Sequence, residues 1–247
     1  MSIAIRREIV TVCRRLYERG LIAGQDGNVS VRLPGRRVLV TPAGMSKVDV
    51  GPNDLVEMHL DEVASSHESR GSRSRARSQV RRSASSGPRA SSEVLMHLRI
   101  YERRPDVNAV VHAHPPTATG FAVAGEGFME CVLPEVIFQV GQVPLLQYAT
   151  PGTTGLADSF EPYVMTHDAF LLANHGATTI GPSLLLAHQR MESLEHAARI
   201  ILAARQLGKV NGLGSTQVAE LMAARQRAGL GGPYPGCSTT GGRHEKQ

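Results

Sequence analysis

Two histidines that stand one residue apart, His112 and His114, offer the clearest chemistry in this sequence of 247 residues. They follow strand-forming residues, and the two prolines after His114 would end any ladder of hydrogen bonds. Because side chains alternate along a strand, both imidazoles should point to one face and Ala113 to the other. The pair could chelate one metal ion, or be two polar residues on a half-exposed strand. A third ligand elsewhere in the chain would favour the metal.

The candidate for that third ligand is His175, which lies in the segment LLANHGATTIG. An apolar strand leads to it, and Gly176 lets the backbone of a tight turn approach closely. Three neutral imidazoles form a recognisable zinc set that leaves a further position for substrate. The sequence therefore predicts a zinc site at His112, His114 and His175, although cobalt or manganese would fit the same ligands.

A second chemically useful group is the triplet Ser91, Ser92 and Glu93, which stands at the start of an expected helix. A carboxylate in the first turn of a helix is often only a favourable partner of the helix dipole. Serine hydroxyls and the N–H groups of a helix N-terminus, however, make an anion site suited to phosphate. Glu93 would lie beside that site and could act as a base while zinc stabilises the charge that develops on substrate.

Two turns, residues 27–32 (GNVSVR) and 41–44 (TPAG), could line the same phosphate pocket with backbone N–H groups. Each alone is typical of an ordinary turn. In chain order, however, Gly27-Asn28-x-Ser30, TPxG, SSE, HxHP and NHG resemble the class II aldolase/adducin family, with the L-fuculose-1-phosphate aldolase type as the best match. The resemblance covers about residues 5–207. It implies an α/β fold, a three-layer α/β/α sandwich around a mostly antiparallel central sheet, and a homotetramer.

The resemblance also implies roles for individual residues. His112, His114 and His175 would bind Zn²⁺, and Glu93 would be the catalytic acid/base and an occasional fourth metal ligand. The residues expected to hold the substrate phosphate are Asn28, Thr41, Gly44, Ser91 and Ser92. The implied reaction is cleavage or formation of a carbon–carbon bond in a ketose 1-phosphate, such as L-fuculose 1-phosphate, through a metal-stabilised enediolate.

The sequence departs from the family pattern at three places. An arginine-serine tract occupies the position of a short hairpin, and Ala43 stands where the family usually has serine or threonine. The related aldolases protonate the aldehyde-side oxygen with a tyrosine, but residues 117–147 contain none, and we do not assign that role to Glu135. A related dehydratase or decarboxylase and a non-catalytic adducin-like interaction domain therefore stay open. An epimerase is disfavoured because such relatives typically carry aspartate in place of Glu93.

The net charge of +5 does not indicate a nucleic-acid-binding surface, because one tract carries it. Residues 64–90 hold seven arginines and one glutamate, a net charge of +6, so the other 220 residues carry about −1. The tract has no aromatic residue and no hydrophobic period, and we expect it to be a disordered or mobile insertion. It could be a solvated loop, a segment that binds RNA or anionic surfaces, or the product of a shifted reading frame. We rank nucleic-acid binding last.

Cysteine usage and hydropathy give an expected location. The three cysteines form no CxxC motif, so neither a disulfide framework nor a zinc ribbon is indicated, and a reducing compartment fits best. No apolar run is long enough to span a bilayer, and the N-terminus has no signal-peptide pattern. We expect a cytoplasmic protein with no membrane partner.

Hydrophobic periodicity predicts the elements that must position these residues. The expected strands are 29–33, 37–40, 54–60 and 107–114, with two more inside 169–181. The expected helices are 4–20, 91–105, 157–165 and 183–207. In the last of these, we expect His188 and His196 on a solvated or interface face. Strands and helices interleave, which indicates one α/β domain over residues 1–214, followed by a partly disordered C-terminal tail over 215–247.

Overall fold

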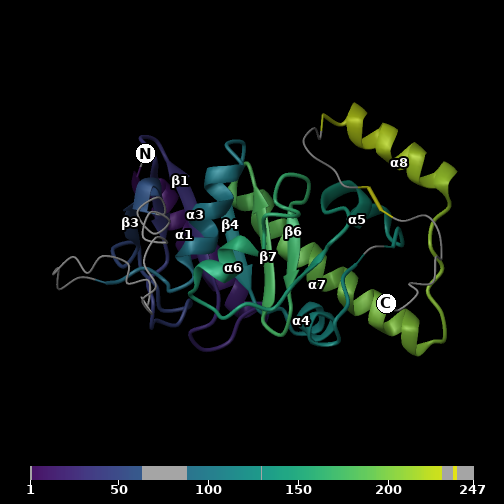
Figure 1. Ribbon diagram of the computed structural model, residues 1–247, viewed down its shortest axis with the longest axis horizontal. Helices are drawn as coiled ribbons and strands as arrows, with labels where there is room; N and C mark the ends of the chain where they lie inside the picture. Colours follow the sequence, from purple (N-terminus) through teal and green to yellow (C-terminus); the bar gives the residue numbers. More distant parts are fainter. Residues whose placement is uncertain (1, 63–87, 129, 230–235, 238–247) are drawn as a thin grey trace, which may run out of the picture.

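A computed structural model describes residues 2–62, 88–128, 130–229 and 236–237. Its centre is a seven-stranded sheet in the order β3-β2-β1-β4-β7-β6-β5 (Figure 1). Every neighbouring pair is antiparallel except β5 and β6. The strands are β1 (Asn28–Leu33), β2 (Arg37–Val40), β3 (Val56–His59), β4 (Ala109–Ala113), β5 (Leu145–Leu146), β6 (Ala169–Leu172) and β7 (Gly176–Gly181).

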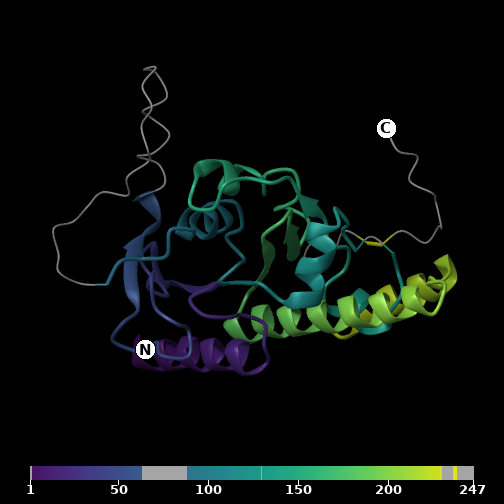
Figure 2. The ribbon, with the colours of Figure 1, turned by 90° about the horizontal axis from the view of Figure 1, so that it is seen from below.

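Helices cover both faces of the sheet, as Figure 2 shows, so the expected three-layer α/β/α sandwich is confirmed. The helices α1, α4 and α7 lie on one face, and α3 and α6 lie on the other. The bounds of these and the remaining helices are α1 (Ser2–Glu18), the short 3-10 helix η1 (Leu60–Glu62), α3 (Val94–Arg103), α4 (Pro116–Val123), α5 (Pro134–Gln139), α6 (Thr154–Asp158), α7 (Leu184–Gln206) and α8 (Ser215–Arg227).

Alternation along the central strand β4 divides the core into two clusters. Val111 and Ala113 pack into the cluster under α1 and α7, whereas Val110 packs into the cluster under α3 and α6. Successive side chains on a strand point to opposite faces, so His112 belongs to the α3 side. The prediction that Ala113 and the histidines face opposite ways is confirmed.

The expected helix over 157–165 is only partly correct. The α-helix covers Thr154–Asp158, and turns follow it through residue 166, past Pro162. Proline lacks an N–H and clashes with the preceding turn, so the helix cannot continue through it. The helices α4 and α5 were not predicted from the hydrophobic pattern. Each begins with a proline at the first helical position, which favours helix starts.

The segment assigned to the C-terminal tail contains the 13-residue helix α8. This helix packs on α5, at the end of the molecule away from α1 (Figure 1), and Arg225 Nε donates to Phe138 O at 3.0 Å. The division into a domain over 1–214 and a tail stays a prediction. The arginine-serine tract lies outside the described residues, apart from 88–90.

The expectation for one of the two α7 histidines is wrong. His196 is exposed, but His188 is 1% exposed and faces α1, and its pKa is lowered by burial and by the nearby Arg15 and Arg19. The reason is that α7 packs against both the sheet and the neighbouring helix α1, so that more than one stripe of the helix is covered.

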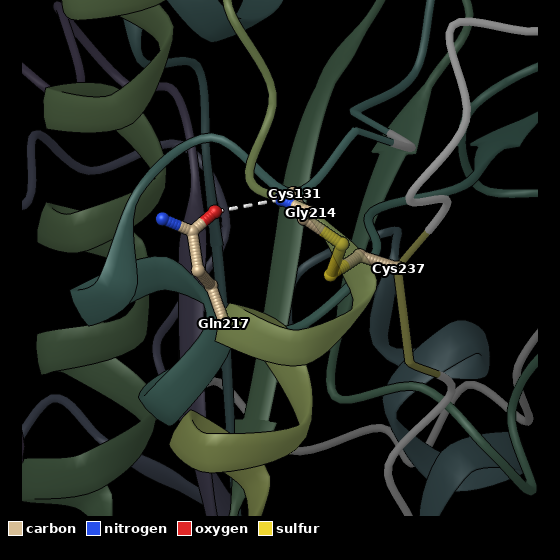
Figure 3. Close-up of a disulfide and its surroundings, with 4 residues drawn as sticks. All are labelled: Cys131, Gly214, Gln217 and Cys237. Carbon is tan, nitrogen blue, oxygen red and sulfur yellow. Dashed lines mark hydrogen bonds between the residues drawn. A yellow bond between two sulfur atoms is a disulfide. The ribbon is translucent and has the colours of Figure 1, made fainter.

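The expectation of no disulfide is also wrong. Cys131 and Cys237 are joined with their Cα atoms 5.2 Å apart, as Figure 3 shows. These residues are 106 positions apart in sequence, and only the fold brings them together. The N–H of Leu213 donates to Cys131 O at 2.7 Å, and the N–H of Gln142 donates to Gly236 O at 3.1 Å, so backbone bonds hold both ends. The cysteine argument for a reducing compartment therefore fails.

Among the helices that the structure describes, none is both long and apolar enough to cross a membrane.

The cysteine arrangement predicts a thiol count. Cys13 is free and buried, and burial raises its pKa to about 12. Protein denatured without reductant should react with a thiol reagent at one site per chain, and at three sites after reduction. Mass spectrometry of the alkylated, digested chain should locate the unreduced label on Cys13. Labels on Cys131 and Cys237 before reduction would contradict the disulfide.

Candidate metal centre and anion pocket

Three imidazoles converge at one edge of the sheet. His112 lies one residue before the end of β4, His114 directly follows the strand, and His175 lies in the turn between β6 and β7. The ring centroids are 4.8–5.0 Å apart, and the candidate ligand nitrogens all lie within 4.8 Å of one another. His112 is fully buried, whereas His114 and His175 are half-buried and open to a pocket. The structure thus brings the three predicted metal ligands together.

Close backbone approach at two glycines makes this convergence possible. A Cβ on Gly27 would lie 2.8 Å from the carbonyl oxygen of His112. A Cβ on Gly176 would lie 2.6 Å from both Ala113 O and His114 Cδ2. Real Cβ atoms do not sit this close to such neighbours, so only glycine fits without displacing the histidine strand. The expected role of Gly176 is confirmed.

Second partners set the proton positions on two of the rings. His112 Nδ1 lies 2.9 Å from Ala177 O, which can only accept, so Nδ1 carries the hydrogen and Nε2 is a bare lone pair. His114 Nδ1 lies 3.4 Å from Asp26 Oδ2, which assigns its ring in the same way. The two Nε2 atoms are 3.2 Å apart. Two lone pairs at that separation repel each other unless a cation lies near both, so this donor set fits a metal ion.

Glu93 completes the site. Its Oε1 lies 3.0 Å from His175 Nε2, and its Oε2 lies 3.3 Å from His112 Nε2. Oε1 is buried and has no hydrogen bond from the described residues, which is a second observation that fits a bound cation. Burial raises the pKa of Glu93, but the adjacent His175 ring and the amide of Asn28 outweigh it and hold the pKa well below its usual range. Glu93 is therefore a carboxylate at neutral pH.

A buried chain of hydrogen bonds behind Glu93 was not predicted. Asn28 Nδ2 donates to Glu93 Oε2 at 2.8 Å, and Asn28 Oδ1 is 2.5 Å from His97 Nε2. Because an amide oxygen only accepts, His97 donates from Nε2, and its Nδ1 accepts from Ser30 Oγ at 2.7 Å. Ser30 Oγ in turn lies 2.8 Å from Tyr101 OH. Each assigned donor points toward Glu93, so the chain fixes the carboxylate in place.

One signal in the sequence could have revealed His97. It lies four residues after Glu93, so the two side chains share one face of α3. Ser30 lies two residues after Asn28 and faces α3 from β1 for the same periodic reason. Burial lowers the pKa of His97 to about 4, so the ring is neutral and can donate and accept at once.

A pocket adjoins the histidines and ends at the N-terminus of α3. The expected phosphate residues Asn28, Gly44, Ser91 and Ser92 line it, together with Gln25, Asp26, Gly27, Pro42, Ala43, Lys47, Glu93, His114 and His175. Thr41 is fully buried and does not line the pocket. Its Oγ1 accepts from the N–H of Val29 at 3.1 Å, and its carbonyl accepts from Ser91 N at 3.3 Å. Thr41 therefore supports the wall, while Ser91 and Ser92 reach the pocket itself.

These features define a class of protein: an α/β/α sandwich with a trihistidine centre beside a carboxylate and an anion pocket. The sequence profile of the Class II Aldolase and Adducin N-terminal domain matches residues 7–202. The chain belongs to this family.

Several relatives are similar over most of their length. A 3-oxo-tetronate 4-phosphate decarboxylase of Escherichia coli K12 is 31% identical over 202 residues, which cover 80% of this chain and 86% of the relative. An L-fuculose phosphate aldolase of Methanocaldococcus jannaschii is 28% identical, with 80% and 95% covered. A crystal structure of YgbL from Escherichia coli superposes with a TM-score of 0.74 at 30% identity, with 89% and 98% covered. An L-fuculose 1-phosphate aldolase structure gives 0.75 at 26% identity, with 90% and 96% covered.

The chain behind Glu93 predicts the effect of removing its central member. His97→Leu leaves Asn28 Oδ1 and Ser30 Oγ without their partner, so the amide can rotate and Glu93 is no longer held. We expect zinc affinity to fall about 10- to 100-fold, as is typical when a ligand loses its supporting hydrogen bonds. His97→Gln keeps a side-chain N–H donor and should stay within about threefold of the wild type. Competition with a chromophoric chelator measures both, and an unchanged affinity in His97→Leu contradicts the proposed support.

The neutral state of His97 predicts acid sensitivity. In the unfolded chain a histidine has a pKa near 6.5, and burial lowers that of native His97 to about 4. Below pH 6.5 the unfolded state binds a proton that the native state does not, so stability is full above pH 6.5 and falls with pH. The expected loss is about 1.4 kcal/mol per pH unit for this residue down to about pH 4. Urea unfolding of metal-free protein at pH 7 and pH 5 should show it, with a smaller loss in His97→Gln. Equal losses in both proteins would contradict the assignment.

Proposed function

We propose that the protein is a zinc-dependent lyase that cleaves or forms a carbon–carbon bond in a ketose 1-phosphate such as L-fuculose 1-phosphate. The observation that supports this best is the placement of Glu93 between a trihistidine centre and a pocket that ends at a helix N-terminus. A substrate in that pocket would have its phosphate at one end and its carbonyl at the other. The family to which the chain belongs agrees with such chemistry.

His112, His114 and His175 would hold the metal ion, with Glu93 as a further ligand before substrate enters. A bound divalent ion supplies Lewis-acid stabilisation of negative charge on the ketone and neighbouring hydroxyl oxygens. Glu93, ionised and fixed by Asn28, would remove the proton from the carbon beside the carbonyl and later return it. Cleavage of the carbon–carbon bond would leave the fragment that carries the ketone and the phosphate as dihydroxyacetone phosphate.

The phosphate end would bind Ser91, Ser92 and the backbone of Gly44. The N-terminus of α3 directs the partial positive charge of the helix dipole toward this end of the pocket. We now assign Asn28 to the support of Glu93, because its amide already bonds to Glu93 and His97. Thr41 would act through its buried bonds to Val29 and Ser91.

A second candidate reaction is decarboxylation of a 3-oxo-tetronate 4-phosphate. The 31% identity to the Escherichia coli decarboxylase favours it, as does the lack of a tyrosine between residues 117 and 147. Loss of CO₂ from such a 3-oxo acid gives the same enediolate, and protonation of that enediolate gives dihydroxyacetone phosphate. The two reactions thus place the same demands on Glu93 and the metal, and differ only in the fragment that leaves.

We further propose a homotetramer in the cytoplasm. Several large apolar side chains on or just after α7 are exposed, which suits a subunit interface: Leu185, Ile200, Leu202 and Leu207. The location stays a prediction, and the disulfide removes one argument for it. A non-catalytic interaction domain is disfavoured because all three histidines and Glu93 are present in a geometry suited to a metal.

The test is formation of dihydroxyacetone phosphate by zinc-loaded protein from each substrate, followed by its coupled reduction with NADH. We expect product from one of the two, with an aldehyde or CO₂ identifying the reaction. Glu93→Gln should lose activity at least about a hundredfold even at saturating zinc, as befits loss of the base, and should bind zinc more weakly because it also loses a ligand. The double variant His112→Ala/His114→Ala should lose both zinc and activity. Product from neither substrate, or unchanged activity in the double variant, would contradict the proposal.

A further inference from the structure

Lys47 is a buried cation in the pocket wall that none of the roles above explains. Only 2% of the residue is exposed, although lysine is rarely buried. Its Nζ donates to the carbonyl oxygens of Gln25 at 2.8 Å and Met45 at 3.0 Å. An ammonium group has three donors, so one N–H is left for a ligand in the pocket that Lys47 lines.

The charges around the pocket indicate what the Lys47 ammonium group could bind. Among the described residues that line the pocket, Lys47 is the only lysine or arginine, whereas Asp26 and Glu93 are both acidic. Hydroxyl groups and a helix N-terminus provide only partial charges, about half an elementary charge for the helix. A phosphate dianion that enters the pocket therefore has one full positive charge from the described side chains to meet, and that charge is Lys47.

Local structure holds the ammonium in place before any ligand arrives. The two carbonyl acceptors belong to different loops, one before β1 and one after β2. Gly44, at φ +71°, turns the second loop so that its backbone and Lys47 line the same pocket. The neighbouring Ala43 offers no hydroxyl there. A charge fixed by two hydrogen bonds loses little side-chain entropy when a ligand binds.

We propose that Lys47 is a specificity-determining residue whose ammonium group binds the phosphate of the substrate. This proposal rests on the proposed function in that it names the charged group that the same site accepts. The competing interpretation is that Lys47 only ties the two loops together.

Three variants separate these interpretations. Lys47→Arg keeps the charge, Lys47→Gln keeps N–H donors for the carbonyls without the charge, and Lys47→Met keeps only the aliphatic length. Calorimetric titration of each zinc-loaded protein with inorganic phosphate gives affinity independently of turnover. Titration with unphosphorylated dihydroxyacetone is the matched control, because a loss caused by loosened loops would weaken both ligands.

We expect Lys47→Gln to weaken phosphate binding about 10- to 100-fold, the range for losing a charged hydrogen bond, with dihydroxyacetone binding and zinc content unchanged. KM for the phosphorylated substrate should rise by the same factor with little change in kcat, and Lys47→Arg should stay within about threefold. Lys47→Met should match Lys47→Gln if it folds, and the glutamine variant alone decides if it does not.

The result that overturns the inference is a folded Lys47→Gln protein whose phosphate affinity and KM equal those of the wild type. An equal loss for phosphate and dihydroxyacetone overturns it in favour of the loop tie, as does a wild type that binds no phosphate up to about 50 mM. Lys47-dependent phosphate binding by a wild type that processes neither sugar phosphate would uphold the inference and contradict the proposed function. Catalysis that does not depend on Lys47 would uphold the proposed function and contradict the inference.

Discussion

The register of three central strands is the constraint on which the rest of the site depends. Asn28 on β1 pairs with His112 on β4, and His112 pairs with Thr178 on β7, so the three residues form one row across the sheet. A slip of one residue would turn His112 toward α7 and away from Glu93. Glycine at positions 27 and 176 lets the chain pass on either side of this row without a clash.

Burial of so many polar groups is tolerated because nearly every one has a partner. Burial keeps His112 neutral by lowering its pKa to about 3, and its Nδ1–H group donates a hydrogen bond to Ala177 O. The chain from Tyr101 to Glu93 likewise satisfies each donor with an acceptor. At the histidine centre itself, Glu93 Oε1 is left without a hydrogen bond from the described residues and lies 3.0 Å from His175 Nε2. An unpaired carboxylate oxygen beside three imidazoles marks where a cation would complete the structure.

Residue type and spacing were enough to predict an α/β domain, the histidine triad and Glu93, because strand alternation and helix starts act over a few residues. The mostly antiparallel sheet was expected only from the resemblance to the family. The support of Glu93 by His97 was missed, since a helical histidine gives no sign of what it faces. The disulfide was missed because 106 residues separate its cysteines and no spacing rule reaches that far. For Thr41 the motif predicted a contact with the substrate phosphate. In the structure its hydroxyl accepts a hydrogen bond from the N–H of Val29 and does not reach the pocket.

The most direct test of the central claim is anomalous diffraction at the zinc edge from crystals of the zinc-loaded protein. The account predicts one strong peak about 2.0–2.1 Å from an Nε2 atom of each of His112, His114 and His175. Glu93 should lie in contact with the ion or one water away. A peak bound elsewhere, or no peak with two of the imidazoles hydrogen-bonded directly to each other, would contradict the account.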